Sequence, residues 1–251
     1  MFLKCVSWCI YMLALKKLFT LFPALLLLWV SSCSARMDGV VREGGAAVIT
    51  IKTSLEPRTA MLIGSLRNFM GEKADGPILD GPAIGRSMEA VPGIGAVAFS
   101  NTGPSALDGS ISVPNLANFF VSGGERSRFI SYTEGRNKGS SSIIINLDRE
   151  SAPDIISKLS PEIEGYLSAL MAPVVLGETS TKQEYLDMVA MIYGRSLSDE
   201  ISAARIRAFI EFPRPVSSAL GGRVSGKQVE FEIPLADLLV LERPLRYEVN
   251  W

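Results

Sequence analysis

The sequence predicts an α+β fold in which helices pack on a mainly antiparallel sheet. Apolar and polar residues alternate in several short segments, most clearly in 47–51, 206–212, 229–233 and 245–251. A period of two places one face of a strand against a core and the other in water, as is usual in antiparallel sheets. Segments with helical spacing of apolar residues lie between them, at 58–70, 151–176 and 181–193.

Local signals support the individual elements. Residues 140–148 (SSSIIINLD) indicate a more buried strand, paired with 129–135 across a turn at 136–139. Pro57 suits the first turn of one helix, Ser151 is expected to cap another, and Gly194 is a natural C-terminal stop for the third. The glycine- and proline-rich stretch 71–93 is expected to be loop with one short helix near 83–90.

The two halves of the later chain share an order of features. The segment 44–57 (glycine, strand, acidic turn, proline, helix) is echoed by 138–153, and each half later has a strand that ends near proline and leads into a short apolar helix. We therefore expect an internal repeat of 44–135 and 138–251, each running β-α-β-β-α-β around one shared core. Coincidence among common residues is the alternative.

The first 32 residues have the parts of a secretory signal. Lys16 and Lys17 precede an uncharged, almost wholly apolar stretch, 18–30, and the small residues Ser31 and Ser32 follow it. Met12 would start a cleaner leader than Met1. Ordinary secretion and an uncleaved membrane anchor are the alternatives, but for an anchor 18–30 is shorter than the roughly 20 residues that span a bilayer. A longer span would bury both lysines, at a cost of about 2.5–3.5 kcal/mol each.

The segment Val30-Ser31-Ser32-Cys33 resembles the lipobox of bacterial lipoprotein precursors: an aliphatic residue, two small residues and an obligatory cysteine. Valine in the first place is a relaxed form that is similar to spirochaete lipoproteins. The resemblance covers the leader and these four residues, and no family is recognised for the rest. It implies a signal peptide over 1–32, a lipid on the Cys33 thiol and a tether over 33–43. A single extracytoplasmic α+β domain over 44–251 would follow.

The resemblance also implies a location. The protein would be anchored to a bacterial membrane through Cys33, and Ser34 is not the aspartate that retains enteric lipoproteins in the inner membrane. We therefore expect the outer membrane, with the domain facing the periplasm.

Composition excludes several kinds of chemistry. The chain has no histidine, and its three cysteines, Cys5, Cys9 and Cys33, all lie in or at the end of the leader. Histidine-based catalysis, a disulfide framework and ordinary zinc or copper sites are therefore not expected, and we expect no cofactor. The leader carries three of the 25 basic residues and none of the 26 acidic ones, so the remainder has a net charge of −4. Nucleic acid is a poor candidate partner for such a chain.

The motifs for catalysis are weak. A carboxylate pair of the kind found in glycosidases has many candidate members: Asp80, Glu89, Asp108, Glu184 and Asp187. The last two are three residues apart on one helix, which is ordinary for a solvated face. Residues 179–182 (Thr-Ser-Thr-Lys) indicate a helix N-cap better than a Ser-Lys pair. The glycines of 93–98 match a dinucleotide pattern but precede a strand, so a turn is the better interpretation.

Apolar residues at the ends of predicted helices are the remaining functional signal. Residues 118–121 and 238–241 end two short helices, and Met188, Met191, Ile192 and Tyr193 lie together on a third. These groups could pack in the core, bind a lipid or peptide, or rest on a membrane. The first hypothesis is a non-catalytic, lipid-anchored module that binds an envelope protein or a lipid, or that has a structural role in the envelope. The alternatives are a carboxylate-dependent envelope hydrolase and a lipid-binding or membrane-inserting lipoprotein.

Overall fold

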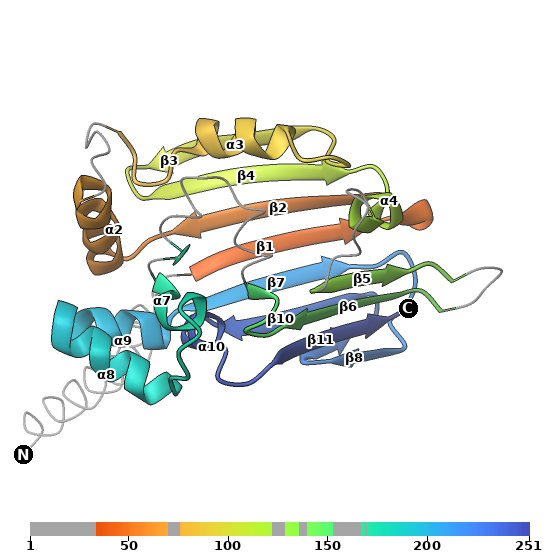
Figure 1. Cartoon of the computed structure of the whole chain (residues 1–251). Coiled ribbons are helices and arrows are strands. Elements are labelled where there is room, and N and C mark those ends of the chain that lie inside the picture. The colour runs from red at the N-terminus through yellow and green to blue at the C-terminus, as the bar shows by residue number, and fades with distance from the viewer. Residues whose placement is uncertain (1–33, 70–75, 122–128, 136–139, 153–166, 169) are drawn as a thin grey trace, which may run out of the picture. The chain divides into compact units, whose positions relative to one another are not determined.

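The computed structural model describes residues 34–69, 76–121, 129–135, 140–152, 167–168 and 170–251. The chain divides into two compact units, Met1–Ser32 and Cys33–Trp251. All described residues belong to the second unit, whose helices and strands are labelled in Figure 1.

A sheet of seven strands, counted over the described residues, forms the larger layer of this unit. Its order is β3-β4-β2-β1-β7-β10-β9. The strands are β1 (Ser34–Val41), β2 (Ala47–Ser54), β3 (Val97–Gly103), β4 (Ala106–Val113), β7 (Arg205–Glu211), β9 (Gly222–Ser225) and β10 (Gln228–Pro234). β1 is parallel to β7, and the other neighbours in this sheet are antiparallel. The predicted α+β class with a mainly antiparallel sheet is confirmed.

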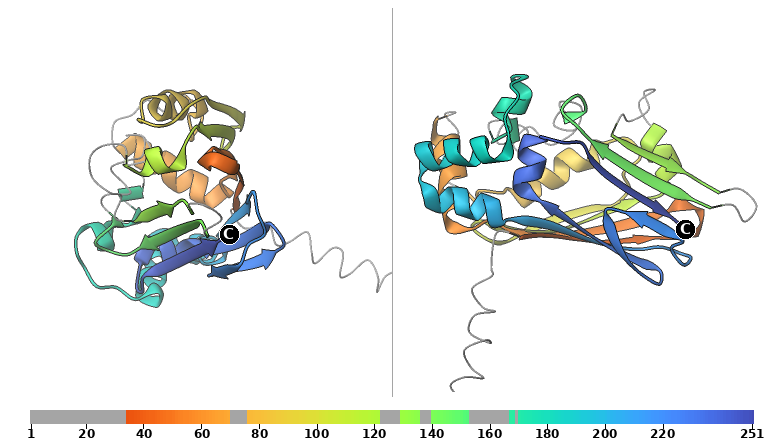
Figure 2. Two further views of the ribbon diagram at one scale, coloured as in Figure 1. Left: turned by 90° about the vertical axis from the view of Figure 1, so that its right-hand side faces the viewer. Right: turned by 90° about the horizontal axis from the view of Figure 1, so that it is seen from below.

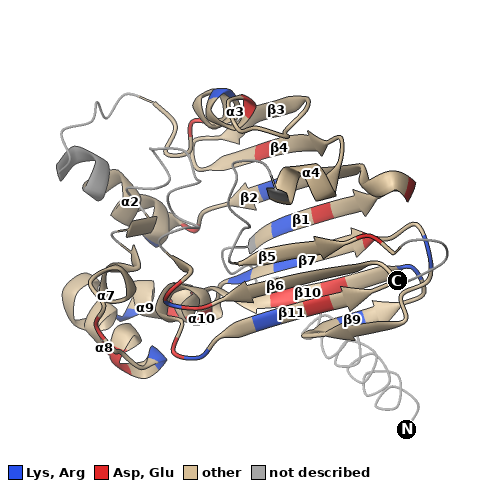
Figure 3. Cartoon of the chain, turned by 45° about the vertical axis from the view of Figure 1, so that its right-hand side comes forward, with Lys and Arg blue, Asp and Glu red and all other residues tan. Residues whose placement is uncertain are grey.

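The alternating segments form strands because the two faces of this sheet meet different surroundings. On the inner face of β7 and β10, Ala208 is paired with Phe231, and both are buried in the core. On the outer face of the same strands, Arg207 lies 3.5 Å from the carboxylate of Glu232. Arg223 on β9 lies 3.8 Å from the carboxylate of Glu230 on β10, and Figure 3 marks basic and acidic residues on these and other neighbouring strands.

A second sheet lies over the inner face of the first (Figure 2). Among the described residues its order is β5-β6-β11-β8, with β5 (Ile130–Thr133), β6 (Ser142–Leu147), β8 (Ser218–Leu220) and β11 (Leu245–Asn250). Antiparallel pairing of β5 with β6 confirms the predicted hairpin, whose turn at 136–139 lies outside the described residues. Trp251 exchanges two backbone hydrogen bonds with Ser141, and its ring lies 4.5 Å from the ring of Phe212 between the sheets. The C-terminus is therefore tied into the core.

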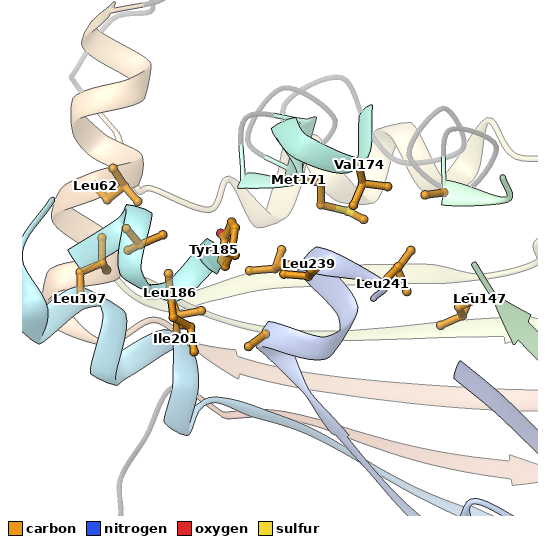
Figure 4. Packing of buried hydrophobic residues seen from close by; sticks show 14 residues of the cluster. Leu62, Leu147, Met171, Val174, Tyr185, Leu186, Leu197, Ile201, Leu239 and Leu241 are labelled. Carbon is orange, nitrogen blue, oxygen red and sulfur yellow. The ribbon is translucent and has the colours of Figure 1, made fainter. Parts of the chain in front are cut away.

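Helices gather at one end of the sheets. The described helices are α2 (Pro57–Phe69), α3 (Gly81–Glu89), α4 (Leu116–Val121), α7 (Ala172–Val175), α8 (Lys182–Tyr193), α9 (Arg195–Ala203) and α10 (Leu235–Val240), with a short 3₁₀ turn at Glu43–Gly45. α3 packs instead on β3, and α4 lies beside β5. Leucines and other apolar residues of α2, α7, α8, α9 and α10 form one buried cluster (Figure 4). This cluster is the second core of the unit.

Two of the predicted helix ends are confirmed by the described residues. Pro57 begins α2, and Gly194 ends α8 with φ 94°. Ala152 is the first described helical residue after Ser151, which is the position predicted for the N-cap of 151–176, and the residues that such a cap would hold lie outside the described residues; in the turn before it, Asp148 accepts a hydrogen bond from the backbone N–H of Ser151. The Ser151 hydroxyl in turn accepts from the N–H of Asp148, so the two residues form a reciprocal cap.

The predicted tether over 33–43 was wrong. Ser34–Val41 form β1, a central strand paired along its length with β2 and β7. Its inward side chains are few, since Gly39 lies between Met37 and Val41, and this weakens the alternation that marks the other strands. Pairing with two neighbouring strands stabilises β1 where its own pattern does not.

The expected repeat is not reproduced in the strand pairing. In the first half β2 pairs with β4, whereas in the second half the corresponding strand β6 pairs with β11 and not with β10. The ferredoxin-like order would place β5 beside β2, but β1 occupies that position and β5 pairs with β6. The shared feature is local: a strand, a short apolar helix and a return strand occur as β4-α4-β5 and as β10-α10-β11.

Candidate functional site

The expected lipidation site lies at the start of the larger sheet. Cys33 is outside the described residues, but it is bonded to Ser34, the first residue of β1. Ser34 is in register with Ser54 at the end of β2 and with Arg205 at the start of β7. Because consecutive Cα atoms are about 3.8 Å apart, Cys33 lies within one residue of this end of the sheet.

Two helices are fastened at the same end. α2 begins three residues after β2 ends, and α9 ends two residues before β7 begins. The carboxylate of Glu200 on α9 accepts hydrogen bonds from the backbone N–H of Thr59 at 3.0 Å and from its hydroxyl at 3.1 Å. Thr59 is buried, so this contact fixes α2 against α9.

α8 and α7 complete the helical end of the unit (Figure 1). α8 and α9 pack side by side and are joined at Gly194. The hydroxyl of the buried Tyr185 on α8 donates to the carbonyl of Leu170, just before α7, at 3.1 Å. Removal from water raises the pKa of Tyr185 to about 12, so its hydroxyl remains a donor at neutral pH.

The three apolar segments that the sequence analysis identified, 118–121, 238–241 and the group from Met188 to Tyr193, have different surroundings. On α10, Leu239, Val240 and Leu241 are buried in the helical core. On α4, Phe119 and Phe120 are half-buried and pack against the core between the sheets. The third segment is different, because its residues at the end of α8 are exposed.

The exposed side chains of α8 are large. The exposed fraction is 81% for Met191, 57% for Ile192 and 52% for Tyr193. Met188, one turn earlier, packs against the helical core. Core packing therefore accounts for the other two apolar segments and leaves the end of α8 unexplained.

A cleft of about 710 Å³ opens beside the start of α8. Its lining within the described residues is Asp148, Arg149, Glu150, Thr179, Ser180, Thr181, Glu184, Leu241, Glu242 and Pro244. The guanidinium of Arg149 donates to the carbonyls of Leu241, Glu178 and Ser180 at 2.8–3.1 Å. Arg149 thus holds these carbonyls together, which is a structural role.

Two acidic residues of this cleft, Glu184 and Glu242, are also engaged in local structure. Glu184 and Thr181 form a capping box at the start of α8, and the hydrogen bonds from Thr181 hold the pKa of Glu184 below its ordinary value. Glu242 accepts from the backbone N–H of Lys182 at 2.9 Å. A general acid needs a raised pKa, so Glu184 is tuned in the wrong direction for that role.

The other candidate carboxylates lie apart from this cleft. Asp80 caps α3 by accepting from the N–H of Ala83, and Glu89 is the last residue of the same helix. Asp108 lies on β4, 4.0 Å from the ammonium of Lys52 on the neighbouring strand. Asp187 accepts a hydrogen bond from the side-chain amide of Gln183 one turn earlier on α8. The structure does not bring these acids into one site.

The two weak motifs have local structural explanations. Thr181 caps α8, as predicted for residues 179–182. Gly93 has φ 86°, and Gly95 donates its N–H to the carbonyl of Ser112 just before β3 begins. The predicted turn into a strand is therefore confirmed, and the geometry is not that of a dinucleotide-binding loop.

No group of three or more acidic or cysteine side chains among the described residues is arranged to hold a metal ion. No described helix has the length and apolar character needed to cross a membrane.

Comparison with known proteins gave one structural likeness. No family matches the sequence, and no curated protein matches it. The fold is similar to that of the folded domain of LppM from Mycobacterium tuberculosis, determined by NMR. The two share 12% sequence identity over 87% of this chain and 88% of that chain, with a TM-score of 0.37.

Proposed function

We propose that this chain is the precursor of a bacterial lipoprotein, and that a lipid on Cys33 holds its folded domain at the outer membrane, facing the periplasm. The observation that carries the proposal is the leader with Val30-Ser31-Ser32-Cys33 at its end. The division of the chain into compact units after Ser32 supports it, because cleavage there would release the folded unit with Cys33 as its first residue.

The chemistry of the cysteine suits this role. Lipoprotein maturation needs a thiol to carry the diacylglyceryl group, and Cys33 is the one cysteine after the apolar stretch of the leader. No other cysteine of the mature chain can compete for it in a disulfide. Each buried methylene contributes about 0.8 kcal/mol, so several acyl chains give stable residence where one does not.

The role that we propose for the domain is binding or envelope structure rather than catalysis. In the cleft beside α8, Glu184 and Glu242 hold Thr181 and Lys182 at the start of the helix, and Arg149 holds three carbonyls. Groups used in this way are not available to bind and cleave a substrate. The candidate partners are an envelope protein or a lipid.

Mass analysis of the native protein tests the anchor. We expect a mature N-terminal peptide that begins at Cys33 and carries acyl mass, and we expect an inhibitor of lipoprotein signal peptidase to leave the leader attached. A protein that retains residues 1–32 with a free thiol at Cys33 would refute the proposal.

Two variants sharpen the result. Cys33→Ala should abolish acylation and leave an unprocessed precursor, because the peptidase requires the modified cysteine. Cys9→Ala changes a cysteine inside the leader and should be acylated and processed like the parent. Loss of acylation in both variants, or in neither, would contradict the assignment of Cys33.

A further inference from the structure

Exposed apolar side chains are concentrated at one end of the domain. Six of the ten exposed large apolar side chains in the described residues belong to α2 or α8 or lie at the end of α7, where Leu176 is the C-cap: Met61, Val175, Leu176, Met191, Ile192 and Tyr193. Five of them are aliphatic or thioether side chains with no polar group to solvate, and Tyr193 carries one hydroxyl. We call these six the helical-end residues.

The core does not account for the exposed end of α8. The buried residues of this helix are Tyr185, Leu186 and Val189, which lie on one face at helical spacing. Ile192 and Tyr193 continue the same face by three and four residues, but there the helix has run past the residues that it packs against, and both are more than half exposed. The apolar stripe of α8 is therefore longer than the protein surface that it covers.

This end of the domain is also the end that carries the anchor. α9 starts at the turn after Tyr193 and ends two residues before Arg205, which is in register with Ser34. α9 has nine residues, so its length is roughly 14 Å. The exposed end of α8 is thus about one short helix away from the residue next to Cys33.

No spacer separates the anchor from the sheet. Ser34, which follows Cys33, is already paired on both sides in the sheet, so the chain cannot extend to lift the domain away from the bilayer. A lipid on Cys33 would hold the helical end at the membrane surface in every molecule. Because the anchor would keep this apolar surface next to the bilayer, lipid is the nearest partner that it could contact.

We propose that the helical-end residues lie against the phospholipid bilayer that holds the Cys33 lipid, so that the domain has a fixed orientation on the membrane. This inference rests on the proposed function and adds a second, non-covalent contact to it. Side chains of this kind enter the boundary between headgroups and acyl chains, where partial burial relieves their contact with water.

A fluorescent probe at Ile192 tests the contact. Once Cys33 is acylated, the mature chain has no other thiol, so Ile192→Cys can be labelled at one position with an environment-sensitive fluorophore. The acylated protein is reconstituted in vesicles of phosphatidylcholine and phosphatidylglycerol, with and without a nitroxide-labelled phosphatidylcholine. Val224→Cys is the matched control, because Val224 is also β-branched and 45% exposed but lies on β9, toward the far end of β10 from Pro234 and Ser34.

We expect the probe at position 192 to shift to shorter wavelength and to lose most of its fluorescence to the nitroxide, and the probe at 224 to do neither. Equal, weak quenching at both positions in acylated protein would overturn the inference while leaving the anchor intact. A blue shift at 192 that is insensitive to nitroxide, but is lost when the protein is diluted in lipid, would overturn it in favour of a second copy. A reconstituted protein whose Cys33 has no acyl mass would refute the proposed function itself, and the inference with it.

Discussion

Replacing Tyr185 with phenylalanine removes a single buried hydrogen bond and makes the stability of the helical end depend on pH in a calculable way. The Tyr185 hydroxyl is buried and donates to the Leu170 carbonyl at 3.1 Å. Loss of this bond should cost about 1 kcal/mol at neutral pH, because the carbonyl loses its partner and the ring packing is retained.

The sign of the pH effect follows from the pKa. The pKa of Tyr185 is about 12 in the folded chain, against 10.0 for an ordinary tyrosine. The folded state therefore keeps its proton where the unfolded state loses it, and the contribution is complete below the unfolded pKa and declines as pH rises from about 10 to about 12. At about pH 11 the parent should have lost about 1.4 kcal/mol from this residue. The phenylalanine variant has no such loss.

Urea unfolding of the unacylated domain measures the difference. We expect Tyr185→Phe to be less stable than its parent at about pH 8 and equally or more stable at about pH 11. Tyr132 and Tyr247, whose pKa values burial also raises, are present in both proteins and cancel. A stability difference that is the same at both pH values would refute the assignment of a buried, hydrogen-bonded Tyr185.

Three further predictions concern single contacts. Gly109→Ala places a Cβ against the ring of Phe99, closer than van der Waals contact allows, and should destabilise the domain by about 1–3 kcal/mol. Phe99→Leu in the same chain should recover part of this loss in thermal unfolding. Thr181→Ala should cost about 1 kcal/mol through loss of the α8 cap. Thr181→Ala should also raise the pKa of Glu184, which an NMR titration measures, and an unchanged pKa would count against the cap. Because the pKa of Glu184 is lowered in the folded parent, its stabilising contribution is present above its ordinary pKa and is lost as pH falls through the folded value. Arg149→Lys should cost about 1–3 kcal/mol in urea unfolding, since an ammonium cannot reach three carbonyls in the geometry of the guanidinium fork, and an unchanged midpoint would show that water replaces those bonds.

The candidate site could be predicted only in part. The proposed leader and the proposed lipidation site at Cys33 come from the sequence, because signal sequences are recognised as linear segments. The sequence also singled out the end of α8, but in the same terms as the apolar ends of α4 and α10. The helix ends differ in how far other parts of the chain bury their apolar side chains. Only the tertiary packing shows that the apolar residues of α10 are buried and that Ile192 is exposed.

By itself the sequence determined the parts of the protein that depend on a residue and its near neighbours. The alternation in β7 and β10, the Thr181 cap, the Gly194 stop and the lack of histidine are all of this kind. The tertiary structure alone decided that Ser34–Val41 form a central strand, that the strands divide between two sheets, and that the halves pair differently. Strand pairing depends on which sheet edge is free when distant segments meet, and no local pattern encodes that.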